Sequence, residues 1–230
     1  MKNLKKVLAV LVALTLVVTC FAACGGNKDN NDAKEIVIGV SGPLTGGAAQ
    51  YGNAVVNAAK LAVNEINAAG GINGTMLKLV SADDEADSGD KAVSAYNSLK
   101  DQGMQIFLGT VTSGSCLAVI DKTAADQMFQ LTPSASADTV IANDNTFQIC
   151  FTDSNQGTRS AQYIAENKLA EKVAVIYDSS DAYSTGIYNT FKAEATKRNL
   201  EIVAEKSFTK DSNKDFSAQI QACKSAGAEL

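Results

Sequence analysis

The stretch IVIGVSGPLTGGAAQYG, residues 36–52, decides the fold class. It begins with a short β-rich run, Ile36–Val40, crosses a loop of glycine and small residues, and enters a helical pattern. The apolar residues of that pattern recur at intervals of four, three, four and three, so we expect them on the inner face of a helix that begins near Gly52. They are Val55, Ala59, Ala62, Ile66 and Ala69. Gly70 and Gly71 are expected to end the helix.

The same alternation of β-rich runs and helical periods continues toward Leu230. Such alternation is typical of an α/β protein with parallel sheets flanked by helices. Further strands are expected at Met76–Ala82, Gln105–Leu108, Phe129–Thr132, Val173–Tyr177 and Ile202–Phe208. Phe147, Ile149 and Phe151 alternate with other residues, which predicts a half-buried strand.

A second sheet is expected to begin near residue 172, because Val173–Tyr177 is continuously apolar. We therefore divide the globular part into a first α/β lobe, residues 35–152, and a second, residues 153–230, whose opening helix Ser154 is expected to cap. The second lobe offers only two clear strands before Leu230, and two strands bury too little to stand alone. We expect that lobe to be truncated.

The amino terminus has the layout of a secretory signal. Lys2, Lys5 and Lys6 precede an uncharged apolar run, and small residues follow before Cys24. The string FAAC resembles a bacterial lipobox, which implies a signal peptide over residues 1–23, lipidation of Cys24 and a flexible polar tether over residues 24–34. Cys20 is a weaker alternative for lipidation. A membrane-spanning anchor is the other alternative, because the uncharged stretch approaches the roughly 20 apolar residues that a span requires.

Composition excludes several function classes. The formal net charge is −5, and it becomes −8 once the three lysines of the signal are removed, so binding to nucleic acid is not expected. The chain has no His, the commonest general base and metal ligand, and it has no GxSxG, P-loop or GxGxxG motif. We expect neither an enzyme nor a metal or other cofactor.

Cysteine spacing defines no framework either. Cys116, Cys150 and Cys223 remain after the signal, an odd number without a CxxC pair. Unpaired buried thiols are favoured, and a Cys116–Cys150 disulfide is the alternative.

Ligands of open α/β sheets bind at the carboxyl ends of the strands, so the loops there are the places to search. Four of these loops are rich in glycine and small hydroxyl residues: Ser41–Gly52, Gly109–Ser115, Thr132–Ser136 and Asp178–Gly186.

These loops carry a specific resemblance. The strings SGPLTGGAAQYG (residues 41–52), NEINAAGGINGTMLKLVSADDEAD (64–87), TPSAS (132–136) and KVAVIYDSSDAYSTG (172–186) resemble the leucine/isoleucine/valine-binding proteins of ABC transporters, of the type I periplasmic-binding-protein family. The likeness covers residues 34–230. It implies two hinged lobes that close on a ligand.

The resemblance also implies the site residues. Ser113 matches the serine that receives the carboxylate of an amino acid, and the segment Ser134, Ala135 and Ser136 matches one whose carbonyl and hydroxyl groups accept from its ammonium group. Tyr51 and Tyr183 match tyrosines that line and close the pocket. The acidic residue that completes the ammonium site in this family would lie beyond Leu230. Ser134 and Ser184 stand where the family commonly has alanine and glycine, and both add polarity.

Each assignment has a structural alternative. Ser113 is also a typical helix cap, Ser134 and Ser136 are typical turn residues beside Pro133, and Tyr51 and Tyr183 are ordinary packing aromatics. The acidic cluster of Asp83, Asp84, Glu85 and Asp87 matches no calcium loop, so we expect a solvated, helix-capping loop in which Asp87 and Asp90 cap the next helix.

The resemblance implies the function. We expect the extracytoplasmic solute-binding component of an ABC transporter, a monomer held to the cell membrane by its lipid, which delivers an aliphatic amino acid to a membrane permease. The alternatives are a ligand-sensing module of the same fold and the binding of an amide or another small polar solute.

Overall fold

Five parallel strands form the first sheet, in the order β2-β1-β3-β4-β5. The structure is a computed structural model that describes residues 35–86 and 89–230. The strands are β1 Ile36–Gly42, β2 Leu77–Asp83, β3 Ile106–Leu108, β4 Gln130–Thr132 and β5 Thr146–Gln148. Every pair is parallel, so all five carboxyl ends lie at one edge of the sheet. The predicted α/β class is confirmed.

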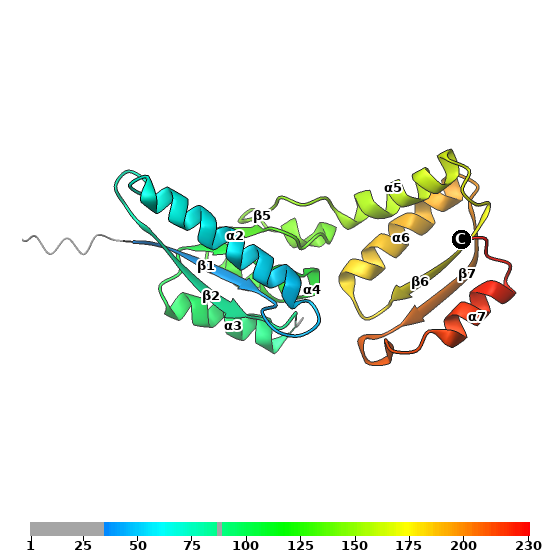
Figure 1. Cartoon of the computed structure of the whole chain (residues 1–230), viewed down its shortest axis with the longest axis horizontal. Helices are drawn as coiled ribbons and strands as arrows, with labels where there is room; N and C mark the ends of the chain where they lie inside the picture. Colours follow the sequence, from blue (N-terminus) through cyan, green and yellow to red (C-terminus); the bar gives the residue numbers. More distant parts are fainter. Residues whose placement is uncertain (1–34, 87–88) are drawn as a thin grey trace, which may run out of the picture. The chain divides into compact units, whose positions relative to one another are not determined.

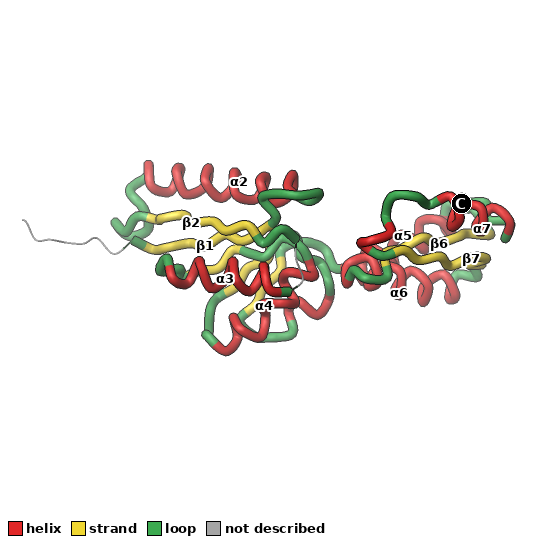
Figure 2. The backbone as a smooth tube through the Cα atoms, turned by 90° about the horizontal axis from the view of Figure 1, so that it is seen from below, coloured by secondary structure: helices red, strands yellow, loops and turns green. Residues whose placement is uncertain are grey.

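Helices cover both faces of this sheet. Helix α2 (Ala49–Ala68) lies on one face, and α3 (Asp90–Asp101) and α4 (Ser113–Ala125) lie on the other (Figure 2). The core between α3, α4 and the sheet contains Tyr96, Phe107 and Val119, all fully buried. The rings of Tyr96 and Phe107 meet edge to face at 5.3 Å.

The second sheet has two parallel strands, β6 (Lys172–Asp178) and β7 (Glu201–Phe208). Helices α5 (Asp153–Glu166) and α6 (Ala182–Lys197) cover one face and α7 (Ser217–Ser225) the other (Figure 1). Two 3₁₀ turns, η1 (Asp138–Ile141) and η2 (Lys210–Ser212), complete the elements.

The chain end extends the second sheet. The Glu229 N–H donates to the Lys172 carbonyl and the Ala174 N–H to the Leu230 carbonyl, both at 2.8 Å. The neighbouring residue Glu171 accepts from Glu201 on the β7 side, so residues 229 and 230 lie along the opposite edge of β6. Residues 35–230 form one compact unit, and the lobe boundary at residue 152 stays a prediction.

The inner face of α2 differs from the predicted one. Its buried residues are Gly52, Val56 and Val63, whereas Ala62 and Ile66 of the predicted face are exposed. The cause is the close approach of Gly52 to the backbone of Pro43, since a Cβ atom on residue 52 would lie 1.9 Å from the Pro43 carbonyl oxygen. Only a glycine at this position allows the contact, and the contact sets the rotation of the helix.

Three further predictions were wrong. Strand β5 includes Phe147 but ends at Gln148, and Phe147, Ile149 and Phe151 are all exposed, with 49%, 69% and 63% of each residue accessible. Helix α5 is capped by Thr152, whose hydroxyl accepts from the Asn155 N–H, and not by Ser154. Asp90 is the first residue of α3 and not its cap, and Asp87 lies outside the described residues.

The signal, Cys24 and the tether also lie outside the described residues, so the lipidation site and the two alternatives to it stay predictions. Among the helices of residues 35–86 and 89–230, none combines the length and the apolar character that crossing a bilayer requires.

Helices α5 and α6 pack closely because of Gly157. A Cβ atom at residue 157 would lie 2.3 Å from the Ile187 carbonyl oxygen and 2.7 Å from the Phe191 nitrogen, both backbone atoms of α6. Backbone atoms of a packed helix cannot move aside as a flexible side chain does. The interface therefore requires a glycine at this position.

We predict that Gly157→Ala lowers the free energy of unfolding by about 1–3 kcal/mol, the usual cost of overpacking. Urea denaturation measures it. Gly47→Ala is the matched control, because a Cβ atom there meets nothing within 4 Å and its φ is not positive. Equal unfolding midpoints for the two variants would contradict the prediction.

Candidate functional site

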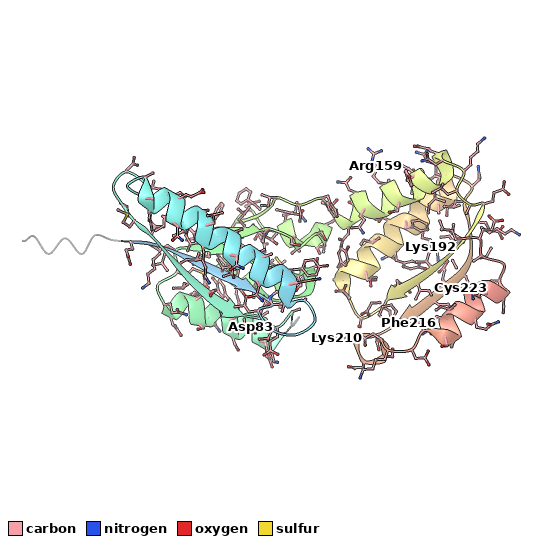
Figure 3. All side chains as sticks on the ribbon, viewed as in Figure 1. Asp83, Arg159, Lys192, Lys210, Phe216 and Cys223 are labelled. Carbon is pink, nitrogen blue, oxygen red and sulfur yellow. The ribbon has the colours of Figure 1, made fainter. Side chains whose placement is uncertain are left out.

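The loops that follow β1 and β2 are joined by Asp83 and Asp84. The Asp83 carboxylate, at the end of β2 (Figure 3), accepts from the Leu44 N–H at 2.7 Å and the Thr45 hydroxyl at 2.6 Å. Asp84 is fully buried and accepts from the Ser41 hydroxyl at 3.0 Å. The acidic cluster is thus a structural support for the loop after β1, and the predicted solvated loop was wrong for Asp84.

The hydrogen bonds to Asp83 also change its titration. Burial by itself would raise the pKa of this carboxyl, but donors from Thr45, Leu44 and Glu85 together outweigh burial and hold the pKa below its ordinary value. Asp83 therefore stays charged at neutral pH and keeps the loop in place.

Ser113 joins the loops that follow β3 and β4. It is the first residue of α4, after the N-cap Thr112, and its side chain is 3% exposed. The Ser113 oxygen accepts from the backbone N–H groups of Ser136 and Ala137, both at 3.1 Å. A serine hydroxyl has two lone pairs and one hydrogen, so these two bonds use its acceptor capacity and the hydrogen remains to be donated.

The segment Ser134–Ser136 is held from several sides. The Thr132 hydroxyl accepts from the Ala135 N–H at 3.0 Å, and the Ala135 carbonyl accepts from Gln148 Nε2 at 2.8 Å. The Ser136 carbonyl accepts from the Asp153 N–H at 2.8 Å. The carbonyl groups of Ala135 and Ser136 thus have protein donors, and the segment's remaining acceptors are the Ser134 carbonyl and the hydroxyl groups.

The two predicted tyrosines lie apart from this network. Tyr51, in the first turn of α2, is 58% exposed. Tyr183, in the first turn of α6, is 39% exposed, and its hydroxyl donates to Gln156 Oε1 of α5 at 3.3 Å. The structure therefore brings Ser113, Ala135 and Ser136 together and leaves Ser134 exposed beside them, but shows no hydrogen bond from the described residues that joins either tyrosine to this group.

A pocket of about 560 Å³ lies next to the start of α4. Its volume suits a small solute, since such sites typically measure about 300–1,000 Å³. It is lined by the α4 start and by loops after β1, β2, β6 and β7: Gly47, Ala48, Glu85, Ala86, Thr112, Gly114, Leu117, Ala118, Asp178, Ser180, Asp181, Ala182 and Lys210 (Lys210 is labelled in Figure 3). None of the six predicted ligand residues lines it, although Thr112, Gly114 and Ala182 are sequence neighbours of Ser113 and Tyr183.

One residue of this region had no signal in the sequence. Asp153 is the first residue of α5, is 1% exposed, and follows the segment that leaves the first sheet. An acid at a helix start is ordinarily a solvated partner of the helix dipole, so nothing in the sequence pattern distinguishes Asp153. Its burial is visible only in the tertiary structure.

The three described cysteines are free thiols. Cys116 and Cys223 are buried and Cys150 is half-buried. Burial raises the pKa of the Cys116 thiol to about 11, so that it stays protonated and unreactive at neutral pH. No cluster of acids and cysteines among residues 35–86 and 89–230 has the geometry to hold a metal ion.

The described residues thus form two parallel sheets flanked by helices, with a pocket at the strand ends beside the start of α4. Comparison with known proteins gives the family. A family model described as periplasmic binding protein matches residues 35–230, and the chain belongs to this family. The expected resemblance is confirmed.

The relatives are amino-acid-binding proteins by name. The chain is 38% identical to Leu/Ile/Val-binding protein homolog 3 of Brucella melitensis, over 85% of this chain and 53% of that protein. It is 36% identical to Leu/Ile/Val-binding protein BraC3 of Rhizobium johnstonii, with the same coverage. The chain spans about half the length of the curated relatives it matches.

Solved structures agree. The substrate-binding protein LivJ of the branched-chain amino acid transporter of Streptococcus pneumoniae, crystallised with isoleucine, superposes with a TM-score of 0.76 at 32% identity, over 83% of this chain and 54% of that one. The two-lobed type I fold is thereby shown, and this chain covers about half of it.

We predict that Ser113→Ala lowers the free energy of unfolding by about 1–3 kcal/mol, because it leaves the buried N–H groups of Ser136 and Ala137 without their acceptor. Urea denaturation measures this difference. Ser134→Ala removes the same hydroxyl from an exposed position and is expected to shift the unfolding midpoint little. If Ser113→Ala unfolds at the wild-type urea concentration, its oxygen is not the acceptor that holds this segment.

Proposed function

We propose that the protein is the extracytoplasmic solute-binding component of an ABC transporter and that it binds an aliphatic, branched-chain amino acid. In this proposal Cys24 carries the lipid that holds the protein, as a monomer, at the outer face of the cell membrane. Closure of the two lobes on the ligand prepares its delivery to a membrane permease. The protein catalyses no reaction.

The observation that carries the proposal is that the Ser113 hydroxyl is left with only its hydrogen to offer. Both of its lone pairs accept backbone N–H groups, so toward a ligand it acts as a donor. It stands in the first turn of α4, where N–H groups and the helix dipole favour an anion. A carboxylate is an anion that a donor of this kind suits.

The opposite end of an amino acid needs acceptors, because an ammonium group has three donors and no lone pair. The Ser134 carbonyl and the Ser136 hydroxyl are the acceptors proposed for it. The two requirements meet within one network, since Ser113 binds the backbone of Ser136. A donor and acceptors that two neighbouring loops bring together in this way suit a zwitterion.

The relatives support the proposal that the ligand has an aliphatic side chain. The pneumococcal protein was solved with isoleucine, and a binding protein of Desulfitobacterium hafniense, 26% identical to this chain, was solved with leucine. We infer the same class of ligand here. Tyr183 is proposed to contact it from α6, so that binding favours the closed arrangement by a population shift between hinge states.

The test is calorimetric titration of the purified protein, as its gene encodes it, with leucine, isoleucine and valine. We predict micromolar or tighter binding, a rise in melting temperature on adding ligand, and unchanged ligand recovered afterwards. The double variant Ser113→Ala with Ser136→Ala is expected to bind about tenfold more weakly or worse, because two charge-assisted hydrogen bonds are lost, each worth about 1.5–3 kcal/mol.

Acetamide and butyramide serve as controls for the alternative of an amide ligand. Tighter binding of an amide than of any amino acid would refute the proposed ligand class. Binding curves of the double variant that match those of the wild type would refute the assignment of the two serines.

A further inference from the structure

Asp153 is a buried carboxylate to which none of the described residues donates a hydrogen bond. Neither of its side-chain oxygens is accessible or accepts a hydrogen bond from any residue that the structure describes. A buried polar group without a partner destabilises a fold, and a charged one more so. Such a group is kept for a reason other than stability.

The surroundings of Asp153 connect three elements. Its N–H donates to the Ser136 carbonyl at 2.8 Å, and its carbonyl accepts from the Thr190 hydroxyl of α6 at 3.3 Å. Its carboxylate packs against Gly186, where a Cβ atom would lie 2.7 Å from Asp153 Oδ2. Asp153 thus lies between the Ser134–Ser136 segment and the helix that carries Tyr183.

The charges around Asp153 are unfavourable to its ionised form. Burial raises the pKa of its carboxyl, the Ser136 hydroxyl opposes this, and the carboxylates of Asp138 on η1 and Asp181 at the start of α6 raise it further. The Cys150 thiol also faces it. The Ser136 hydroxyl is the neighbour that favours the charged form, although the two groups are not aligned as a hydrogen bond.

This neighbour gives the carboxylate a role. The charge of an ionised carboxylate attracts the hydrogen of a nearby hydroxyl even where the two groups are not aligned as a hydrogen bond, so the hydroxyl turns its lone pairs outward. Ser136 then offers a ligand only acceptors, as an ammonium group requires, just as Ser113 offers only a donor. The buried negative charge also attracts a cation through a medium of low dielectric constant.

We propose that Asp153 is a positioning residue for the ammonium group of the ligand, which acts by orienting the Ser136 hydroxyl and by placing a buried negative charge behind it. This inference rests on the proposed function and adds a residue to it. It also accounts for the cost of the burial, because the charge that destabilises the empty protein strengthens the complex.

The test compares Asp153→Asn with wild type, using leucine as the probe at pH 7. The variant is expected to bind leucine about tenfold more weakly or worse, yet to melt at or above the wild-type temperature. The sign follows from the raised pKa: the charged carboxyl lowers stability above its folded pKa, and the neutral amide lacks that effect. Asp121→Asn, the same change at an exposed position on α4, is the matched control and is expected to match wild type.

The pH profile separates a positioning role from a packing role. Below neutral pH the wild-type affinity for leucine is expected to fall as the pH falls through the raised pKa of Asp153, because the protonated carboxyl no longer orients Ser136. The affinity of Asp153→Asn is expected to stay constant over the same range. A Ser136→Ala background should remove most of the remaining effect of Asp153→Asn in a double-mutant cycle.

Four results would overturn the inference. The first is that Asp153→Asn binds leucine as tightly as wild type and with the same pH profile. The second is that Asp153→Asn loses stability together with affinity, which would show that Asp153 has only a packing role. If the asparagine variant does not fold, the third is a double-mutant cycle in which the effects of Asp153→Glu and Ser136→Ala on leucine affinity simply add, because additivity would show that Asp153 does not act through Ser136. A wild-type protein that binds no amino acid refutes the proposed function itself, and this inference with it.

Discussion

The candidate site depends on the two hydrogen bonds that the Ser113 oxygen accepts from the N–H groups of Ser136 and Ala137. Parallel strands bring the loops after β3 and β4 to one edge of the sheet, but strand pairing alone leaves their relative position open. The buried side-chain oxygen of Ser113 fixes that relative position. In doing so it loses its acceptor capacity, and the same bonds that fix the loop determine what the serine can offer to a ligand.

Neighbouring polar groups act in the same way on the rest of the site. Thr132 holds the Ala135 N–H, Gln148 holds the Ala135 carbonyl, and Asp153 holds the Ser136 carbonyl. Each bond occupies one donor or acceptor of a short segment that would otherwise present both kinds of group to a ligand. A segment constrained in this way discriminates between ligand groups by charge and hydrogen-bonding type, which a flexible serine-rich loop cannot do.

The further role proposed for Asp153 extends this principle from hydrogen bonds to charge. Asp83 and Asp153 are both aspartates at the ends of elements, yet their pKa values move in opposite directions. Hydrogen-bond donors of the loop that Asp83 supports lower its pKa. Burial and neighbouring carboxylates raise the pKa of Asp153. The first stabilises the fold at neutral pH, and the ionised form of the second lowers the stability of the fold.

The sequence by itself determined the α/β class, the strands and the family, because β-rich runs, helical periods and loop motifs are local patterns that a residue carries wherever it is placed. It also named Ser113 and Ser136 as candidate ligand residues, through their match to known motifs, and the hydrogen bond between them came from the structure. The tertiary structure decided the rotation of α2, which follows from the contact of Gly52 with Pro43, and the exposure of Phe147, Ile149 and Phe151. It alone revealed Asp153, because burial and the absence of a donor among the described residues are properties of the packed neighbours and not of the residue.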